Sequence, residues 1–388
     1  MHTLDTDFTE AADALRSGDH ARARSALNRV LAQDPSNTRA WLALAQVGAA
    51  AGDQQAMRQA VDRLLAVDPR NLPGLLLKAD HLHATADTRS AASFYLAALK
   101  AAPPPERLGP VLAAHLKRAR ERCDQYAAQY GAYILEQLSV RGFGAGSSPR
   151  FAQSIDIVLG RKQIYLQQPR YYYFPGLPQI QFYQRDQFPW IGALEQATPD
   201  IREELLAVMQ EPAAFAPYVQ GYSNRPQKQE AGMRDNPDWS AFYLWKDGSV
   251  VEENAQRCPR TMQALADLPL AKVKNRSPSV LFSLLRAGAH IPPHNGLVNT
   301  RLICHLPLIV PERCSFRVGN EVREWREGEA WLFDDSIEHE AWNRSDSTRV
   351  ILLFDVWRPE LSAEERELVA ALFEAIDAHG GRPADWSI

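Results

Sequence analysis

Four of the ten histidines of this 388-residue chain lie between positions 290 and 339, among short apolar segments typical of β-strands. They are His290, His294, His305 and His339, and Arg349 follows on another apolar segment. Histidine is the commonest metal ligand in proteins, and a buried guanidinium needs an anion close to it. The order of His294, His339 and Arg349 therefore indicates a redox metal held by imidazoles, with a basic residue that fixes an anionic cosubstrate.

Each of these residues, taken alone, also has a plainer explanation. His294 lies between Pro292-Pro293 and Asn295-Gly296, so we expect it on a rigid turn at the mouth of a barrel. His339 lies in the polar segment 334–340, which we place between strands. A single histidine there is more often a hydrogen-bonded structural residue, and a single arginine at the start of a strand is more often a charge on the rim. Within the same segment, we interpret Asp334 and Asp335 as turn residues that orient the loop.

The segment 299–309 is the clearest case of a strand that could present polar groups to an interior. Alternation places Arg301, Ile303 and His305 on one face and Cys304 on the other, where it fills the core. If the first face looks into a barrel, the buried Arg301 needs an anion or hydrogen bonds. If that face looks into solvent, Ile303 is simply exposed.

The second half of the chain has the pattern of an antiparallel β domain. Segments bounded by Gly, Pro, Asn or Asp predict strands at 279–286, 299–309, 314–318, 321–325, 329–333 and 348–356. Six short strands with tight turns indicate a barrel or a double-sheet jelly roll. A final helix is predicted to begin at Ser362, because Ser362-Ala363-Glu364-Glu365 forms a capping box.

The first hundred residues predict helices that repeat. Asp34-Pro35-Ser36-Asn37 recurs 34 residues later as Asp68-Pro69-Arg70-Asn71, and each unit reads as helix, Gly-Asp turn, helix and Pro stop. This resembles the tetratricopeptide repeat, with units at about 4–37, 38–71 and 72–105; a helical bundle with coincident Asp-Pro turns is the alternative. We therefore divide the chain into a helical repeat domain with a capping helix at 1–140, a linker at 141–150 and a β domain at 151–388.

Composition excludes several classes of partner. A formal net charge of -4 gives no reason to expect nucleic acid or an anionic membrane. The sequence contains no apolar run of the roughly 18 residues that a membrane span needs, and its acidic N-terminal segment lacks the pattern of a signal peptide. The four cysteines have no metal-type spacing. We expect a cytoplasmic protein that acts without nucleic acid or membrane.

Three blocks of the β domain resemble a known family. HNGLVNTRLICHLPLIVP, GEAWLFDDSIEHEAW and RVILLFDVWRPEL are similar to the catalytic domain of the aspartyl/asparaginyl β-hydroxylases, and the similarity extends more thinly from about 165 to the C-terminal helix. The resemblance implies a double-stranded β-helix preceded by helical repeats. It also implies an oxygenase that uses Fe(II), 2-oxoglutarate and O2.

The resemblance assigns the two metal ligands and leaves a third position open. His294 and His339 correspond to the iron ligands, whereas most iron(II) oxygenases add a carboxylate to two histidines. That carboxylate would stand two residues after the first histidine, where this chain has Gly296. The family also has a glycine there.

The resemblance assigns the cosubstrate pocket as well. Arg349, aided by Ser283, corresponds to the residue that pairs with the distal carboxylate of 2-oxoglutarate, and a planar guanidinium suits a carboxylate. His305 corresponds to the residue at the other carboxylate, and Trp239 to an aromatic wall of the pocket.

Two further arginines remain open. The family often has an arginine where this chain has Ile303, and we hypothesise that Arg301, on the same strand face, replaces it. Arg234 aligns weakly with a residue that binds the substrate carboxylate, but it fits a surface charge equally well.

By resemblance, the reaction is hydroxylation of the β-carbon of Asp or Asn in a peptide or protein bound partly by the repeats. Two alternatives stay open: the same chemistry on a free amino acid or a lipid acyl chain, and a repeat scaffold whose oxygenase domain has lost activity. Gly296 and Ile303 motivate the scaffold, whereas the retained histidines and Arg349 favour an enzyme.

Overall fold

The structure is a computed structural model that describes residues 4–219 and 234–380. The chain forms two compact units, Met1–Arg161 and Lys162–Ile388, and each is described by itself.

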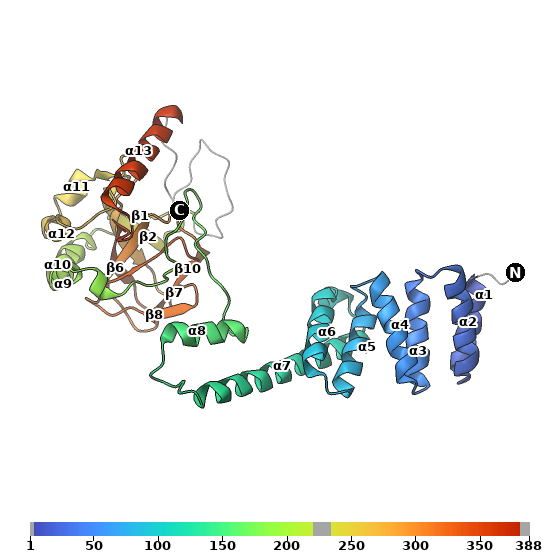
Figure 1. Ribbon diagram of the computed structural model, residues 1–388. Helices are drawn as coiled ribbons and strands as arrows, with labels where there is room; N and C mark the ends of the chain where they lie inside the picture. Colours follow the sequence, from blue (N-terminus) through green and yellow to red (C-terminus); the bar gives the residue numbers. More distant parts are fainter. Residues whose placement is uncertain (1–3, 220–233, 381–388) are drawn as a thin grey trace. The chain divides into compact units, whose positions relative to one another are not determined.

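The first unit consists of helices, and Figure 1 shows its first six standing side by side in antiparallel pairs. Pairs α1–α2, α3–α4 and α5–α6 coincide with the three predicted repeat units, and the long α7 follows them. The helices are α1 (Leu4–Arg16), α2 (His20–Gln33), α3 (Thr38–Ala50), α4 (Gln54–Val67), α5 (Leu72–Ala84), α6 (Thr88–Ala101), the 3-10 turn η1 (Pro105–Arg107), α7 (Pro110–Ser139) and α8 (Pro149–Val158).

The turn inside each repeat has the same geometry three times. Asp19, Asp53 and Asp87 each cap the second helix of a pair, because each carboxylate accepts a hydrogen bond from the backbone N–H three residues later. The residue before each aspartate has a left-handed backbone: Gly18 at φ 77°, Gly52 at φ 71° and Ala86 at φ 63°. The same helix cap and the same turn therefore recur every 34 residues, with the period found in the sequence.

Small residues let the paired helices approach each other. Ala91, Tyr95 and Ala98 of α6 are buried together with Leu76 of α5 and Ala119 of α7. Helix α7 thus covers the last apolar face of the stack, as predicted for a capping helix.

The boundary between the two units lies after Arg161, and not at the linker 141–150. The reason is that the chain returns to α7 after this linker. A Cβ added at Gly131 of α7 would lie 3.0 Å from Nη2 of Arg161 and 3.6 Å from Cδ1 of Leu159. Helix α8 and the residues that follow it up to Arg161 therefore belong to the repeat unit.

The second unit is built on two antiparallel sheets. Its strands are β1 (Ala216–Pro217), β2 (Trp239–Lys246), β3 (Ser249–Val250), β4 (Val280–Leu285), β5 (His290–His294), β6 (Arg301–Ile309), β7 (Cys314–Val318), β8 (Glu321–Glu324), β9 (Trp331–Phe333), β10 (His339–Asn343) and β11 (Arg349–Trp357). Its helices are η2 (Arg185–Gln187), α9 (Ile191–Gln196), α10 (Thr198–Val208), η3 (Pro212–Ala214), α11 (Glu252–Ala255), α12 (Pro259–Leu265) and α13 (Ala363–Gly380).

The strand order is that of a double-stranded β-helix. The larger sheet runs β1-β2-β4-β11-β6-β9, with β3 beside β2, and the smaller sheet runs β5-β10-β7-β8. From β4 to β11 the chain passes between the two sheets and returns, so that strands distant in sequence become neighbours. The predicted fold class, helical repeats followed by a jelly roll, is confirmed.

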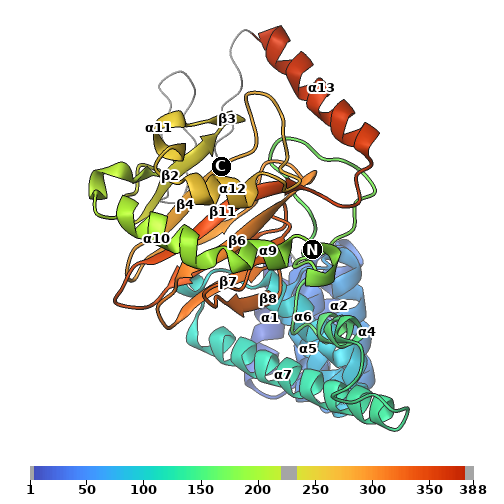
Figure 2. The same ribbon diagram turned by 90° about the vertical axis from the view of Figure 1, so that its left-hand side faces the viewer.

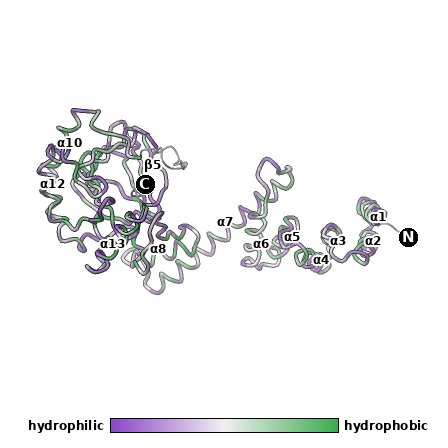
Figure 3. The backbone as a smooth tube through the Cα atoms, turned by 90° about the horizontal axis from the view of Figure 1, so that it is seen from above, coloured by the Kyte–Doolittle hydropathy of each residue, from purple (hydrophilic) through white to green (hydrophobic). Residues whose placement is uncertain are grey.

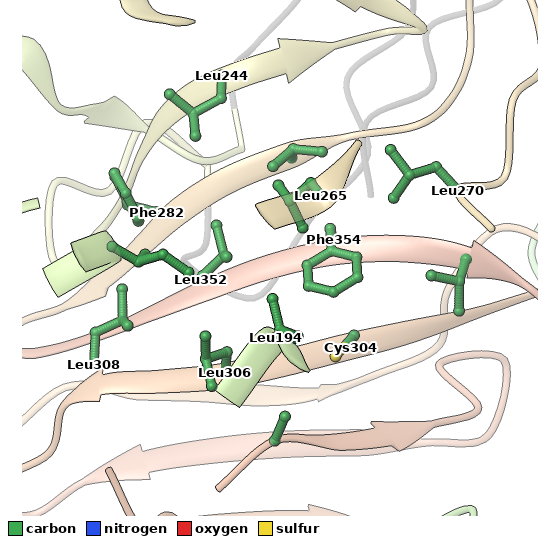
Figure 4. Close-up of a cluster of buried hydrophobic side chains, with 14 of the residues drawn as sticks. Leu194, Leu244, Leu265, Leu270, Phe282, Cys304, Leu306, Leu308, Leu352 and Phe354 are labelled. Carbon is green, nitrogen blue, oxygen red and sulfur yellow. The ribbon is translucent and has the colours of Figure 1, made fainter. Parts of the chain in front are cut away.

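The larger sheet separates two cores. Leu302, Cys304 and Leu306 of β6 point to the outer face, which α9, α10 and α12 cover (Figure 2). Figure 4 shows this outer core, in which Leu194 of α9 and Leu265 of α12 lie against Phe354 of β11. Alternation therefore turns the opposite side chains of β6 and β11 toward the smaller sheet.

Two site residues lie on strands that the sequence did not predict. His294 is the last residue of β5 rather than part of a turn, and His339 is the first residue of β10 rather than part of a loop. Two prolines made β5 read as a turn, but an outer strand tolerates them because one of its edges needs no donors. The capping box of α13 is confirmed, because Ser362 and Glu365 exchange hydrogen bonds of 2.8 and 3.1 Å.

Among the described residues, no helix combines the length and the apolar character of a membrane span. Figure 3 shows hydrophilic and hydrophobic residues mixed along the helices.

The three equivalent turns give a prediction about stability. A left-handed backbone strains alanine but not glycine. A Cβ at Gly52 would meet nothing within 4 Å, so a substitution there changes backbone strain without adding a steric clash. We expect Ala86→Gly to raise the free energy of unfolding of the repeats by about 0.5–1 kcal/mol and Gly52→Ala to lower it by about 1 kcal/mol. Urea denaturation followed by circular dichroism measures both; the same sign for both variants would contradict the assignment.

Candidate active site

A cavity lies between the two sheets of the second unit. Its empty volume is about 520 Å³, part of it open to solvent. The larger sheet contributes side chains from β2, β4, β6, β9 and β11, and the smaller sheet contributes Ile291, His294, Phe316, His339 and Ala341. Of the two orientations left open for this face of β6, the structure has the inward one, since Arg301, Ile303 and His305 all line the cavity.

The two predicted metal ligands face each other across a strand pair. His294 and His339 are register partners of the antiparallel strands β5 and β10, and their ring centroids are 4.1 Å apart. One cross-strand pair thus brings together two histidines that have 44 residues between them in the chain.

Backbone carbonyls fix the orientation of both imidazoles. Nδ1 of His294 lies 2.8 Å from the carbonyl oxygen of Pro292, and Nδ1 of His339 lies 3.0 Å from that of Ile337. A ring that donates from Nδ1 keeps the lone pair of Nε2 for a metal. Burial lowers the pKa of His294 to about 4, and it lowers that of His339 as well, so both rings are neutral at physiological pH. Two neutral, oriented imidazoles are in the form in which histidine binds a metal ion.

A carboxylate occupies the space beside the glycine at the third ligand position. A Cβ built on Gly296 would lie only 2.1 Å from Oδ2 of Asp335, so no side chain fits there without displacing Asp335. The backbone N–H of Gly296 also donates to the carbonyl oxygen of Asp335 at 2.6 Å. In the described part of the chain, His, Cys, Asp and Glu form no group of three that could hold a metal ion. The donor set from the protein is therefore two histidines, with Asp335 nearby.

Asp335 belongs to a buried charged triad on the cavity wall. Nη2 of Arg301 lies 3.5 Å from Oδ2 of Asp335, and its Nη1 lies 3.2 Å from Oδ2 of Asp355. Burial raises the pKa of Asp335 to about 7, against the effect of Arg301 and together with the neighbouring carboxylates Asp334 and Asp355. Because two carboxylates already surround Arg301, it offers no spare positive charge in place of the arginine absent at Ile303.

Arg349 has the opposite environment. Its side chain is buried, with 1% of its surface exposed, and Nη1 donates to the carbonyl oxygen of Ser283 at 3.3 Å. Among the described residues no carboxylate forms an ion pair with it, and its Nε has no hydrogen-bond partner. Burial without a counter-charge lowers the pKa of Arg349 to about 10.

The other buried arginines of the described chain show what is missing at Arg349. Arg276 pairs with Asp377, Arg301 with Asp335 and Asp355, and Arg358 with Asp334. An unpaired buried charge costs several kcal/mol, so this guanidinium is placed to receive an anion from outside the protein.

The remaining predicted cosubstrate residues gather around Arg349. The indole N–H of Trp239 donates to the hydroxyl of Ser283 at 3.2 Å, and both residues line the cavity. His305 is buried between Phe316 and Phe333, with Nδ1 lacking a partner in the described structure. Its burial and the nearby Arg349 hold its pKa well below the usual range. Within the described lining of the pocket, His305 is therefore a neutral imidazole, and Arg349 is a cation without a carboxylate partner.

Arg234 is placed differently from the other predicted residues. It is half-buried and forms a β-bridge with Val219, and it is not part of the described lining of the cavity. Its role in binding substrate stays a prediction.

Sequence reasoning missed four aromatic residues of the cavity: Tyr218, Phe316, Trp325 and Phe333. Tyr218 stacks on Trp239 with ring centroids 4.2 Å apart. Aromatic residues are common in any apolar strand, so only alternation along 314–318 could have indicated that Phe316 points inward.

The site is thus a cavity between two antiparallel sheets with two inward histidines and a buried cation, and comparison with known proteins shows which family the domain is similar to. Residues 195–359 match the family model of aspartyl/asparaginyl beta-hydroxylase, and residues 9–47 match that of the tetratricopeptide repeat. The C-terminal domain is therefore similar to the aspartyl/asparaginyl beta-hydroxylase family, and a match to the tetratricopeptide repeat precedes it in the same chain.

Several curated relatives cover this domain. The human aspartyl/asparaginyl beta-hydroxylase is 35% identical over 184 residues, which are 47% of this chain and 23% of that protein. An ornithine lipid ester-linked acyl 2-hydroxylase of Rhizobium tropici is 37% identical over 175 residues, 44% of this chain and 58% of that protein. The Xenopus tropicalis aspartate beta-hydroxylase domain-containing protein 2 is 32% identical over 214 residues, 54% and 55% of the two chains. The match thus spans less than two thirds of each of these relatives.

Among solved structures, the TPR2B-domain:pHsp70 complex of yeast Sti1 matches with a TM-score of 0.28 and 16% identity, over 31% of this chain and 96% of that one. A predicted oxalate decarboxylase from Thermotoga maritima matches with a TM-score of 0.21 and 10% identity, over 31% of this chain and 81% of that one. Scores this low add nothing to the fold derived from the strand order above.

The raised pKa of Asp335 gives a prediction about pH. In the folded state this carboxyl binds its proton up to about pH 7, whereas in the unfolded chain it ionises near 4, so its burial costs stability as the pH rises between these values. We expect Asp335→Asn to remove this loss. In the absence of metal, the free energy of unfolding of the variant relative to that of the wild type should rise by about 2 kcal/mol from pH 5 to pH 7.

Urea denaturation at several pH values measures this difference, and Asn in place of the exposed Asp346 is the control. A gain for Asp335→Asn that does not depend on pH would contradict the buried, protonated carboxyl.

Proposed function

We propose that this chain is an Fe(II)- and 2-oxoglutarate-dependent hydroxylase that acts on Asp or Asn side chains of a peptide or protein. The single observation that carries this proposal is the buried guanidinium of Arg349 without a carboxylate partner, in the same cavity as two oriented histidines. A dicarboxylate that also reaches the metal accounts for both features, because one of its carboxylates meets Arg349.

The described side chains fit this cosubstrate. Arg349 would bind the distal carboxylate with Ser283 beside it, since the hydroxyl of Ser283 accepts from Trp239 and its own proton remains free to donate. His305 would face the other carboxylate. With Ile303 in place of an arginine, a bound metal would neutralise most of the charge at that end.

The donor set also fits iron. Nε2 of His294 and Nε2 of His339 would hold the ion, and the carbonyls that accept from their Nδ1 atoms would keep the rings in place. Iron bound there, with 2-oxoglutarate and O2, supplies an oxidant for an unactivated C–H bond while the cosubstrate ends as succinate and CO2. Asp335, beside Gly296 in the same cavity, would be available to hold a water, and Trp239 and Phe333 would limit access of bulk water.

The repeat unit supports a peptide or protein as the substrate. Helices α3, α5 and α7 line a second cavity with an empty volume of about 940 Å³, partly open to solvent, whose lining includes Gln46, Leu77, Asp80 and His115. Apolar surface with scattered polar groups suits an extended peptide. We keep the cytoplasm as the proposed compartment because all four cysteines are free.

A lipid acyl chain is the second candidate substrate. The Rhizobium relative is named for acyl hydroxylation, and Ile291, Ile351 and Leu353 give the cavity apolar walls. The repeats favour the peptide, because an acyl chain gives them nothing to bind.

Turnover of 2-oxoglutarate tests the enzyme directly. We expect the purified chain with added Fe(II) to convert 2-oxoglutarate to succinate, and the double variant His294→Ala/His339→Ala to lower this rate by more than about 100-fold because both ligands are gone. His290→Ala is the matched control: this histidine lies on the same strand, is exposed and pairs with Glu340. It should retain the wild-type rate.

The results of these assays distinguish an active hydroxylase from an inactive scaffold. Equal loss in His290→Ala would mean that the strand, and not the site, had been damaged. Absence of succinate from the wild type would favour the inactive scaffold. A peptide pool and an acyl-lipid extract, each searched for products 16 Da heavier, then distinguish the two substrate classes.

A further inference from the structure

Arg349 differs from the other buried arginines in what holds its side chain. Three of them, Arg276, Arg301 and Arg358, are fixed by aspartates. The guanidinium of Arg349 instead lies over the indole ring of Trp325, with its central carbon 4.7 Å from the ring centroid. An aromatic face thus takes the place that a carboxylate has elsewhere in this domain.

Trp325 is built into the wall of the cavity. It follows β8, is buried with 4% of its surface exposed, and lines the cavity together with Arg349 and His305. Its ring packs against Phe316 at 5.4 Å and stacks on Trp331 at 5.9 Å. These contacts with Phe316 and Trp331 fix the position of the Trp325 ring independently of Arg349.

The choice of an aromatic partner has a consequence for charge. A carboxylate would hold the guanidinium but would cancel its positive charge, leaving little attraction for an anion. A ring face attracts the cation by about 0.5–2 kcal/mol and carries no net charge. Arg349 is thus oriented while its full charge stays available to a ligand.

We propose that Trp325 is a positioning residue for the cosubstrate: its ring face orients Arg349 and thereby sets the affinity for 2-oxoglutarate. This inference rests on the proposed function and names a residue that neither the motifs nor the family resemblance indicated. The indole N–H of Trp325 has no partner in the described structure, so the ring face is the polar contact that accounts for a tryptophan at this position.

The test compares a variant that keeps a ring with variants that remove it. Trp325→Phe retains an aromatic face, whereas Trp325→Leu and Trp325→Met retain apolar bulk without one. The dissociation constant of 2-oxoglutarate is measured by calorimetry on the full chain loaded with Mn(II), and succinate assays with Fe(II) give KM and kcat.

We expect Trp325→Phe to bind 2-oxoglutarate within about 3-fold of the wild type, and the Leu and Met variants to bind it about 3- to 30-fold more weakly. The change should fall on KM for 2-oxoglutarate, with kcat within about 3-fold at saturation, because Trp325 acts through Arg349 and not on the reacting atoms.

Phe182→Leu is the matched control. Phe182 is a buried aromatic residue of the same cluster that, in the described structure, neither lines the cavity nor has a ring contact with Trp325, so its loss should lower stability and leave the dissociation constant unchanged. Weakening by Phe182→Leu as large as that by Trp325→Leu would show that packing alone sets the affinity, and would overturn the proposal.

Two failures remain distinguishable. If the wild-type chain with Mn(II) does not bind 2-oxoglutarate, the proposed function fails. If the wild type binds it, and the Leu or Met variant, shown to be folded by circular dichroism, binds it equally well, then only the role of Trp325 fails.

Discussion

The unbalanced charge of Arg349 is the constraint on which the cavity depends. A guanidinium at 1% exposure is stable only if something compensates it, and every other buried arginine of the described domain has an aspartate for that purpose. Here the protein supplies a carbonyl oxygen and a tryptophan face, which orient the group without neutralising it. The structure thus tolerates an incomplete charge balance that an anionic ligand would complete.

The β-sandwich makes this arrangement possible through alternation. In β6 and β11 every second side chain enters the outer core against α9, α10 and α12, and that packing fixes the strands. The intervening positions are then free to carry Arg301, His305 and Arg349 toward the smaller sheet, where the β5–β10 pair brings His294 and His339 together. The outer core supplies the stability that allows polar groups, normally costly to bury, to line the inner cavity.

Much of this could be predicted from the sequence. The 34-residue period predicted the three repeats, strand alternation placed Arg301, Ile303 and His305 on one face of β6, and the family resemblance assigned His294, His339 and Arg349 to one site. The rest depends on contacts between distant segments. The 141–150 linker does not end the first unit because residues after α8 pack on Gly131. Asp335 fills the space beside Gly296, and Trp325 supports Arg349, and no local pattern marks either contact. Strand β5 was not predicted because its two prolines favour a turn.

The most direct test of the account is a crystal structure of the chain with Mn(II) and 2-oxoglutarate. The account predicts a metal on Nε2 of His294 and Nε2 of His339, with one carboxylate of the ligand reaching that metal and the other paired with the guanidinium of Arg349. A ligand bound with its distal carboxylate away from Arg349, or a metal that contacts only one of the two histidines, would contradict it.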